Sequence, residues 1–115
     1  MSGCLFCMIA RREIPAAIVY EDEAVIAFED INPQLPIHTL IIPRAHYAHI
    51  GDDVPEEILG KLFAAVKKVA QIKGVEDRGY RVVVNTGEDA RQTVHHLHVH
   101  VLGGAVLPIG MGPAD

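Results

Sequence analysis

Four of the chain's seven histidines lie in one short segment, His95 to Leu102, in which imidazole alternates with aliphatic side chains from His96 onward. Side chains of a β-strand point alternately to its two faces, so a strand here places His96, His98 and His100 on one face, about 7 Å apart. A solvated strand face would be served equally well by Lys, Thr or Glu. Only imidazole acts as nucleophile, proton carrier and metal ligand near neutral pH, so three in register indicate chemistry.

Two kinds of chemistry fit this row of histidines. Alternate histidines on a strand can hold a catalytic zinc ion whose open position activates water. Alternatively, the central His98 can attack phosphorus while its neighbours supply hydrogen bonds and positive charge to the phosphate oxygens. The spacing does not separate the two. Asn85, Gln92 and Thr93 precede the histidines and are neutral hydrogen-bonding residues that could hold a phosphate, which favours phosphoryl chemistry.

The two cysteines, Cys4 and Cys7, have the spacing of half a tetrahedral zinc site. A redox pair is less favoured, because thioredoxin-like motifs follow a strand and only three residues precede Cys4. A pair of plain buried thiols is the third interpretation. The N-terminal segment lacks the basic and apolar regions of an export signal, so we expect a cytoplasmic protein without a disulfide between Cys4 and Cys7.

The composition is that of a packed globule, because 50% of the 115 residues are hydrophobic and only 22% are charged. Ten basic residues against fifteen acidic residues give a net charge of −5, which argues against a nucleic acid polymer as partner. No apolar stretch approaches the roughly 20 residues that cross a bilayer, so no membrane partner is expected. The length predicts a single domain over residues 1–115, with its core over about 4–104 and an irregular tail over 105–115.

The hydrophobic pattern predicts five strands and two helices. Short β-branched and aromatic runs predict strands over residues 17–21, 24–29, 38–43, 79–85 and 94–102. A short helix is predicted over 4–12, and a long helix begins with a capping signal at Asp53 and stops at Gly74. The apolar stripe of the long helix comprises Leu59, Leu62, Phe63, Val66, Val69 and Ala70. This order predicts an α+β fold, with a five-stranded antiparallel sheet and both helices packed on one face.

Several separated motifs resemble one known family. In chain order they are Ile14-Pro15-Ala16, Tyr20-Glu21-Asp22, Phe28 to Gln34, His38 to His46, Val84 to Gly87 and His96 to Leu102. Together they resemble the Hint-like branch of the histidine triad (HIT) family, over nearly everything from Cys4 to Gly104. The resemblance implies the HIT-like fold, a homodimer whose two sheets join, and a purine nucleotide of the AMP or GMP type bound by each protomer.

The family resemblance also implies an activity. Members of this branch cleave purine nucleoside phosphoramidates or aminoacyl adenylates to the nucleoside monophosphate, through a covalent nucleotidyl-histidine that falls on His98 here. The runner-up activity is hydrolysis of dinucleoside polyphosphates. A third possibility, from another class, is a nucleotide-binding regulatory module with vestigial catalysis.

The resemblance assigns roles to individual residues. His96 and His100 would flank His98, with His100 bonding the phosphate oxygens. His38 would meet these three histidines from the neighbouring strand. The residues at the phosphate and leaving group would be Asn85, Gln92 and Thr93. Asp30 would accept from both ribose hydroxyls, since a carboxylate can take two donors at once. The apolar slot for the base would comprise Leu5, Phe6, Ile9, Phe28, Ile31 and Leu40.

By the same resemblance, Cys4 and Cys7 could be completed by His46 and His96 as ligands of a structural zinc ion, with His49 as the alternative to His46. The sequence departs from the family pattern at His95, where an aromatic residue or proline is usual, at Arg91, where glycine is usual, and in a tail without tryptophan. A guanidinium at Arg91 could bind a substrate phosphate or carboxylate, or could obstruct the leaving-group pocket.

Overall fold

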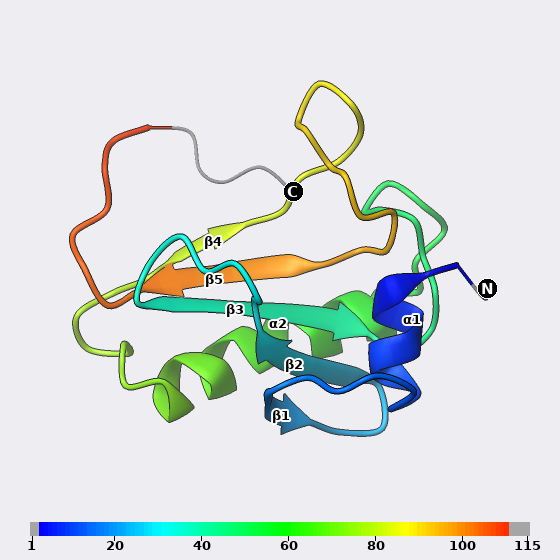
Figure 1. Ribbon diagram of the computed structural model, residues 1–115, viewed down its shortest axis with the longest axis horizontal. Coiled ribbons are helices and arrows are strands. Elements are labelled where there is room, and N and C mark those ends of the chain that lie inside the picture. The colour runs from blue at the N-terminus through cyan, green and yellow to red at the C-terminus, as the bar shows by residue number, and fades with distance from the viewer. Residues whose placement is uncertain (1–2, 111–115) are drawn as a thin grey trace.

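In the computed structural model, residues 3–110 are described, and they form a five-stranded antiparallel sheet with one long and one short helix (Figure 1). The elements in chain order are α1 (Leu5–Ala10), β1 (Ile18–Glu21), β2 (Val25–Glu29), β3 (Ile37–Pro43), α2 (Glu56–Ile72), β4 (Arg81–Val83) and β5 (Val99–Gly103). The strands lie side by side in the order β1-β2-β3-β5-β4. The predicted α+β class and the predicted number of elements are confirmed.

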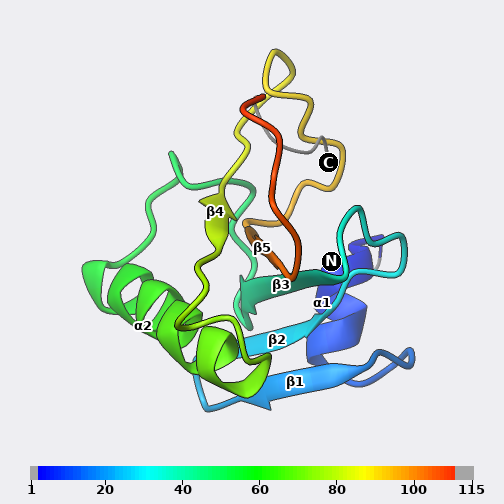
Figure 2. The same ribbon diagram turned by 90° about the vertical axis from the view of Figure 1, so that its left-hand side faces the viewer.

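The central strands are apolar on both faces, and this decides where the helices pack. Val25, Ala27 and Ile41 point to one face and pack against α2. Ile26, Phe28, Leu40 and Ile42 point to the other face, where Phe6 and Ile9 of α1 cover them. Because each face needs its own cover, the helices lie on opposite sides of the sheet (Figure 2), and the prediction that both pack on one face is wrong.

Helix α2 differs from its prediction at its start. Pro55, and not Asp53, occupies the N-cap position, and no side chain caps the helix there. Glu56 and Glu57 in the first turn interact favourably with the positive N-terminal end of the helix dipole. The predicted stop at Gly74 is confirmed, with a left-handed φ of 73° that suits glycine after the C-cap.

Within the apolar stripe of α2, Phe63 is not buried. Its side chain is 40% exposed, whereas Ala65 takes a place in the core between Leu62 and Val66. The stripe that faces the sheet is therefore narrower and composed of smaller residues than the periodicity suggests.

The last two strands are shorter than predicted. Strand β4 spans Arg81–Val83 and lies at the sheet edge, and β5 begins at Val99 although the pattern predicted a strand from Val94. Residues 105–110 contain no helix or strand, and the rest of the predicted tail, 111–115, lies outside the described residues. None of the helices in residues 3–110 is long and apolar enough to span a membrane.

Candidate functional site

The three alternating histidines are all buried, at 0 to 2% exposure, so none of them solvates a strand face. His100 lies in β5 opposite Leu40 of β3, and His98 immediately precedes the strand. His96 lies outside the sheet ladder, which begins at Val99, and the backbone N–H of Leu97 beside it donates to the carbonyl of Tyr47 in the loop after β3. The predicted single row of three imidazoles therefore divides into two groups.

The first group, which we call the histidine cluster, consists of Asp30, His38, His98 and His100. The backbone N–H of Gln34 donates to Nδ1 of His38 at 3.1 Å, so the proton of this imidazole is on Nε2. That Nε2 lies 2.8 Å from Nδ1 of His100, which therefore accepts, and His100 carries its own proton on Nε2. These contacts fix the tautomers of both rings.

His98 is oriented by the backbone beside it. Its Nδ1 lies 2.7 Å from the carbonyl oxygen of His96, to which it donates, so the lone pair of the ring is on Nε2. The rings of Phe6 and His100 each lie 5.1 Å from the ring of His98, centre to centre. An imidazole that is held by its Nδ1–H and keeps a lone pair on Nε2 is suited to nucleophilic attack.

The same distances bear on the alternative of a catalytic zinc ion. Two nitrogen ligands of a tetrahedral zinc ion are about 3.3 Å apart, given a Zn–N distance of about 2.05 Å. The 2.8 Å between His38 and His100 is a hydrogen-bond distance instead. The predicted zinc site of His96, His98 and His100 is not assembled, because Nδ1 of His96 faces Cys4 and Cys7 instead. Asp30, His38 and His100 are close enough together to hold a metal ion, with the two imidazoles at hydrogen-bond distance.

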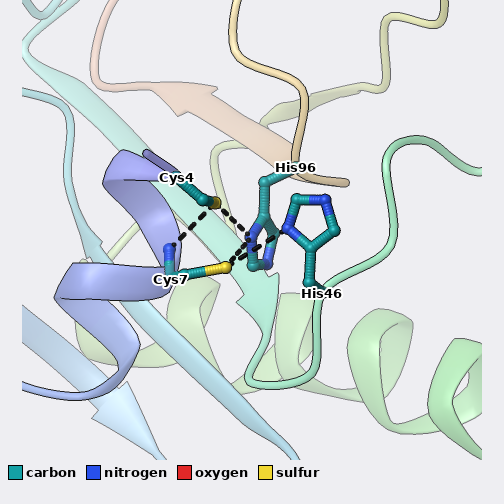
Figure 3. A group of neighbouring side chains, drawn as sticks. All are labelled: Cys4, Cys7, His46 and His96. Carbon is teal, nitrogen blue, oxygen red and sulfur yellow. Dashed lines mark hydrogen bonds between the residues drawn. The ribbon is translucent and has the colours of Figure 1, made fainter. Parts of the chain in front are cut away.

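The second group, which we call the thiol cluster, consists of Cys4, Cys7, His46 and His96 (Figure 3). Nδ1 of His96 lies 3.2 Å from Sγ of Cys4 and 3.4 Å from Sγ of Cys7, and Nδ1 of His46 lies 3.2 Å from Sγ of Cys7. Nε2 of His96 donates to the carbonyl of Pro43 at 2.9 Å, so the lone pair on its Nδ1 faces the two sulfurs. The four donor atoms all lie within 4.8 Å of one another.

These four donors fit a tetrahedral zinc ion. Two thiolates and two imidazoles are a common zinc ligand set, and a sulfur and a nitrogen on one zinc ion are about 3.6 Å apart, given bonds of about 2.3 and 2.05 Å. The other candidate, His49, is outside the cluster and accepts from the backbone N–H of Gly51. The geometry selects His46 as the fourth residue.

Burial sets the protonation of the thiol cluster. Desolvation lowers the pKa of His96 from 6.5 to about 4, so this imidazole is neutral at pH 7 and available to a metal ion. Desolvation and the neighbouring Cys4 raise the pKa of Cys7 to about 11. The thiol of Cys7 therefore stays protonated until a cation compensates for the charge of the thiolate.

An apolar cleft of about 580 Å³ opens beside the histidine cluster. All six residues predicted to hold the base line it: Leu5, Phe6, Ile9, Phe28, Ile31 and Leu40. Asp30 and Thr93 line it as well. The cleft reaches the histidine cluster through two of its walls, because Asp30 also contacts His38 and Phe6 also contacts His98.

Further residues of the cleft were not predicted to line it. They include Ile14, Pro15 and Ala16 in the segment after α1, together with Val94. The signal was present in the sequence, since Ile14-Pro15-Ala16 is one of the motifs that resemble the HIT family. The motif carried no assigned role because apolar residues next to a proline are equally typical of ordinary packing.

The side chain of Gln92 is buried and holds the loop before His96 in place. The amide nitrogen of Gln92 donates to the carbonyls of Ala48 and Val94, and its oxygen accepts from the N–H of Gly87. Both amide hydrogens are therefore used in this conformation, which gives Gln92 a structural role, and its phosphate contact stays a prediction. Asn85 is half-buried, and Arg91 is exposed with a left-handed φ of 65°.

Known proteins resemble this chain in sequence and in structure. The model of the family described as "HIT domain" matches residues 11–106. The "14 kDa zinc-binding protein" of Zea mays is 50% identical over 107 residues, which cover 90% of this chain and 83% of that protein.

Two solved structures are similar to this fold. A HIT family hydrolase from Legionella pneumophila Philadelphia 1 matches with a TM-score of 0.90 and 45% identity, covering 96% of this chain and 100% of that one. A histidine triad nucleotide-binding protein from Candida albicans matches with a TM-score of 0.82 and 30% identity, covering 96% of this chain and 87% of that one.

Proposed function

The chain belongs to the HIT family of hydrolases and nucleotide-binding proteins, and from this premise we propose that it cleaves purine nucleoside phosphoramidates or aminoacyl adenylates to the nucleoside monophosphate. The observation that carries the proposal is the orientation of His98. Its Nδ1–H is held by the carbonyl of His96 at 2.7 Å, and its Nε2 lone pair lies in a cluster that adjoins the apolar cleft.

The reaction proceeds in two displacements at the α-phosphorus. In the first, Nε2 of His98 forms a bond to phosphorus, and the bond from phosphorus to the leaving group breaks; a departing amine takes up a proton from solvent, whereas a departing carboxylate leaves as the anion. In the second, the oxygen of a water molecule bonds to phosphorus, and that water gives up a proton to solvent. The bond to His98 breaks, Nε2 recovers its lone pair, and the nucleoside monophosphate departs. His100 stabilises the charge of both transition states by donating its Nε2–H to a phosphate oxygen.

The nucleotide occupies the cleft with its base between the apolar walls. The aromatic rings of Phe6 and Phe28 line the cleft and can pack against a purine, an interaction that needs no charged side chain. Asp30 accepts from the ribose hydroxyls, and Thr93 and Asn85 serve the phosphate and the leaving group.

Replacing the nucleophile tests this proposal. His98→Ala should abolish turnover of a fluorogenic adenosine phosphoramidate while isothermal titration still detects AMP binding. Undiminished turnover would reject His98 as nucleophile. Faster cleavage of a diadenosine polyphosphate would favour the dinucleotide hydrolase, and tight AMP binding without any hydrolysis in the unmodified protein would favour a regulatory module.

We further propose that the thiol cluster binds a structural zinc ion, held by Cys4, Cys7, His46 and His96. The fit of these donors to a tetrahedral site supports this, as does the zinc-binding maize relative. A bound ion would cross-link α1 to the loop after β3 and to the segment before β5. Metal analysis of protein purified without added zinc tests the proposal, and a stoichiometry near zero would refute it.

We also propose a homodimer in which two sheets join. Strand β4 lies at the sheet edge and leaves Tyr80 and Val82 more than a third exposed beside it, a surface that a second copy could cover. Sedimentation velocity should then give twice the 12.5 kDa mass of the chain. A single species at the monomer mass would contradict the dimer.

A further inference from the structure

We propose that Asp30 is a positioning residue for the phosphate-binding His100, acting through His38, in addition to its contact with the sugar. The inference rests on the proposed function, which assigns the sugar to Asp30 and a phosphate oxygen to His100. One carboxylate then both touches the substrate and, together with the backbone N–H of Gln34, holds the direction in which a pair of buried imidazoles donates.

The two oxygens of Asp30 have separate partners. Oδ1 accepts from the backbone N–H of Asn32 at 2.8 Å, which closes the turn after β2. Oδ2 lies 3.3 Å from Nε2 of His38. The hydrogen bond from Asn32 holds the carboxylate in the turn. Oδ2 is therefore kept in a fixed position, where it can accept from Nε2 of His38.

The imidazole of His38 is constrained at both ends. Gln34 donates to its Nδ1, and the carboxylate of Asp30 faces its Nε2. Both contacts favour the tautomer with the proton on Nε2, which is also the one that can donate to Nδ1 of His100 at 2.8 Å. Asp30 therefore reinforces the direction of the hydrogen bond from His38 to His100.

That direction determines what His100 presents to a phosphate. When Nδ1 of His100 accepts, its proton is on Nε2, which becomes a donor. In the opposite tautomer of His38, the proton of His100 would move to Nδ1, and Nε2 would present a lone pair to an anionic phosphate oxygen. His38 and His100 are 3% and 0% exposed, so water cannot correct the wrong tautomer, and the low local dielectric increases its cost.

The test separates the two roles of Asp30 by removing the sugar contact from the substrate. Asp30→Asn keeps an oxygen for the N–H of Asn32 but turns an amide N–H₂ toward the Nε2–H of His38. The variant and the unmodified protein are compared on an adenosine phosphoramidate and on its 2′,3′-dideoxy analogue, which has no hydroxyl for Asp30 to hold.

We expect Asp30→Asn to lower kcat on the dideoxy substrate by about 10- to 100-fold, less than the 10²- to 10³-fold typical for deletion of an oxyanion donor itself. In a His38→Ala background, the same change should have little further effect on that substrate, because the route to His100 is already broken. Asp53→Asn, the same chemical change at an exposed carboxylate in the loop before α2, is the matched control and should leave kcat unchanged.

A second measurement does not depend on activity. The ¹⁵N chemical shifts of the imidazole nitrogens report the tautomer, and those of His38 and His100 should change in Asp30→Asn but not in Asp53→Asn. Unchanged shifts, or equal kcat of Asp30→Asn and the unmodified protein on the dideoxy substrate, would overturn the inference. Absence of turnover of either substrate by the unmodified protein would instead reject the proposed function, and the shifts would still decide the role of Asp30.

Discussion

The thiol cluster and the histidine cluster both take histidines from one five-residue segment, His96 to His100, and they use imidazole in opposite ways. In the thiol cluster, His96 is held by the carbonyl of Pro43 at Nε2 and turns its Nδ1 lone pair toward two sulfurs. In the histidine cluster, His98 is held at Nδ1 and keeps its lone pair on Nε2. The carbonyl that holds each ring decides which nitrogen carries the lone pair, and the surrounding side chains decide whether that nitrogen suits the proposed metal ion or the proposed attack on phosphorus.

The two clusters are also physically joined. His96 contributes its side chain to the thiol cluster and its backbone carbonyl to His98. Phe6, which lies between the two cysteines in sequence, packs with its ring 5.1 Å from that of His98. The comparison predicts that changes in the histidine cluster act on the rate, whereas changes in the thiol cluster act mainly on stability.

Apart from removal of the nucleophile His98 itself, the largest expected effect is on the rate, from His100→Asn. The asparagine oxygen can still accept from His38 near the position of Nδ1, but the Nε2–H donor is lost. We expect kcat to fall by about 10²- to 10³-fold, or about 3 to 4 kcal/mol of transition-state stabilisation. The exposed neighbour provides the control, since His95→Asn should keep full activity. Equal kcat values for His100→Asn and His95→Asn would show that His100 takes no part in the reaction.

The next effect is on the pH dependence of stability in the metal-free protein. Burial lowers the pKa of folded His96 to about 4, whereas the unfolded value is 6.5. Between these values the unfolded chain takes up a proton that the folded chain does not, so stability falls as the pH falls through this window, by about 3 kcal/mol in total. Urea unfolding at several pH values should show a flatter profile for His96→Asn, and parallel profiles would contradict the prediction.

Metal removal should lower the stability of the folded protein by an amount comparable to or smaller than this pH effect, which a fall in Tm reports. A bound ion stabilises the folded state by about 2.7 kcal/mol when its free concentration is a hundredfold above Kd. A chelator should therefore lower the Tm of the unmodified protein and of His49→Ala, but not that of Cys7→Ser. If Cys7→Ser responds to the chelator as strongly as the unmodified protein, the thiol cluster is not the metal site.

The smallest effect, on stability, is expected from the loop before His96. Arg91 has a left-handed φ of 65°, a conformation that costs an L-residue roughly 1 to 2 kcal/mol and glycine almost nothing. Because glycine also gains freedom in the unfolded chain, Arg91→Gly should stabilise the protein by about 0.5 to 1 kcal/mol, which thermal unfolding resolves as a few degrees. Ala90→Gly, beside it, should destabilise instead.

The sequence predicted the members of both clusters better than their arrangement. Alternation placed His98 and His100 together, and the spacing of Cys4 and Cys7 indicated half a zinc site, because both signals depend on local geometry alone. The departure of His96 from the sheet could not be predicted. It depends on a backbone hydrogen bond from Leu97 to Tyr47, between segments far apart in the chain, and such a contact leaves no periodic signal.

A similar limit applies to the helices and to Gln92. The runs in β2 and β3 correctly indicated buried strands, but apolar faces on both sides of the sheet require cover on both sides, so α1 and α2 separate. The polarity of Gln92 predicts a phosphate contact, which stays a prediction, but not the structural role that its side chain has. Its hydrogen bonds to Ala48 and Val94 depend on how the loop folds back, which residue type alone does not specify.

We propose that His98 forms a transient bond to phosphorus, and intact-mass measurement during turnover detects that bond itself. Protein quenched in denaturant at alkaline pH within the first turnover should gain the mass of one nucleotidyl group, and peptide mapping should place it on His98. The increment should disappear on longer incubation and be absent from His98→Ala. Steady turnover with no increment, or with the nucleotidyl group on any other residue, would contradict the account.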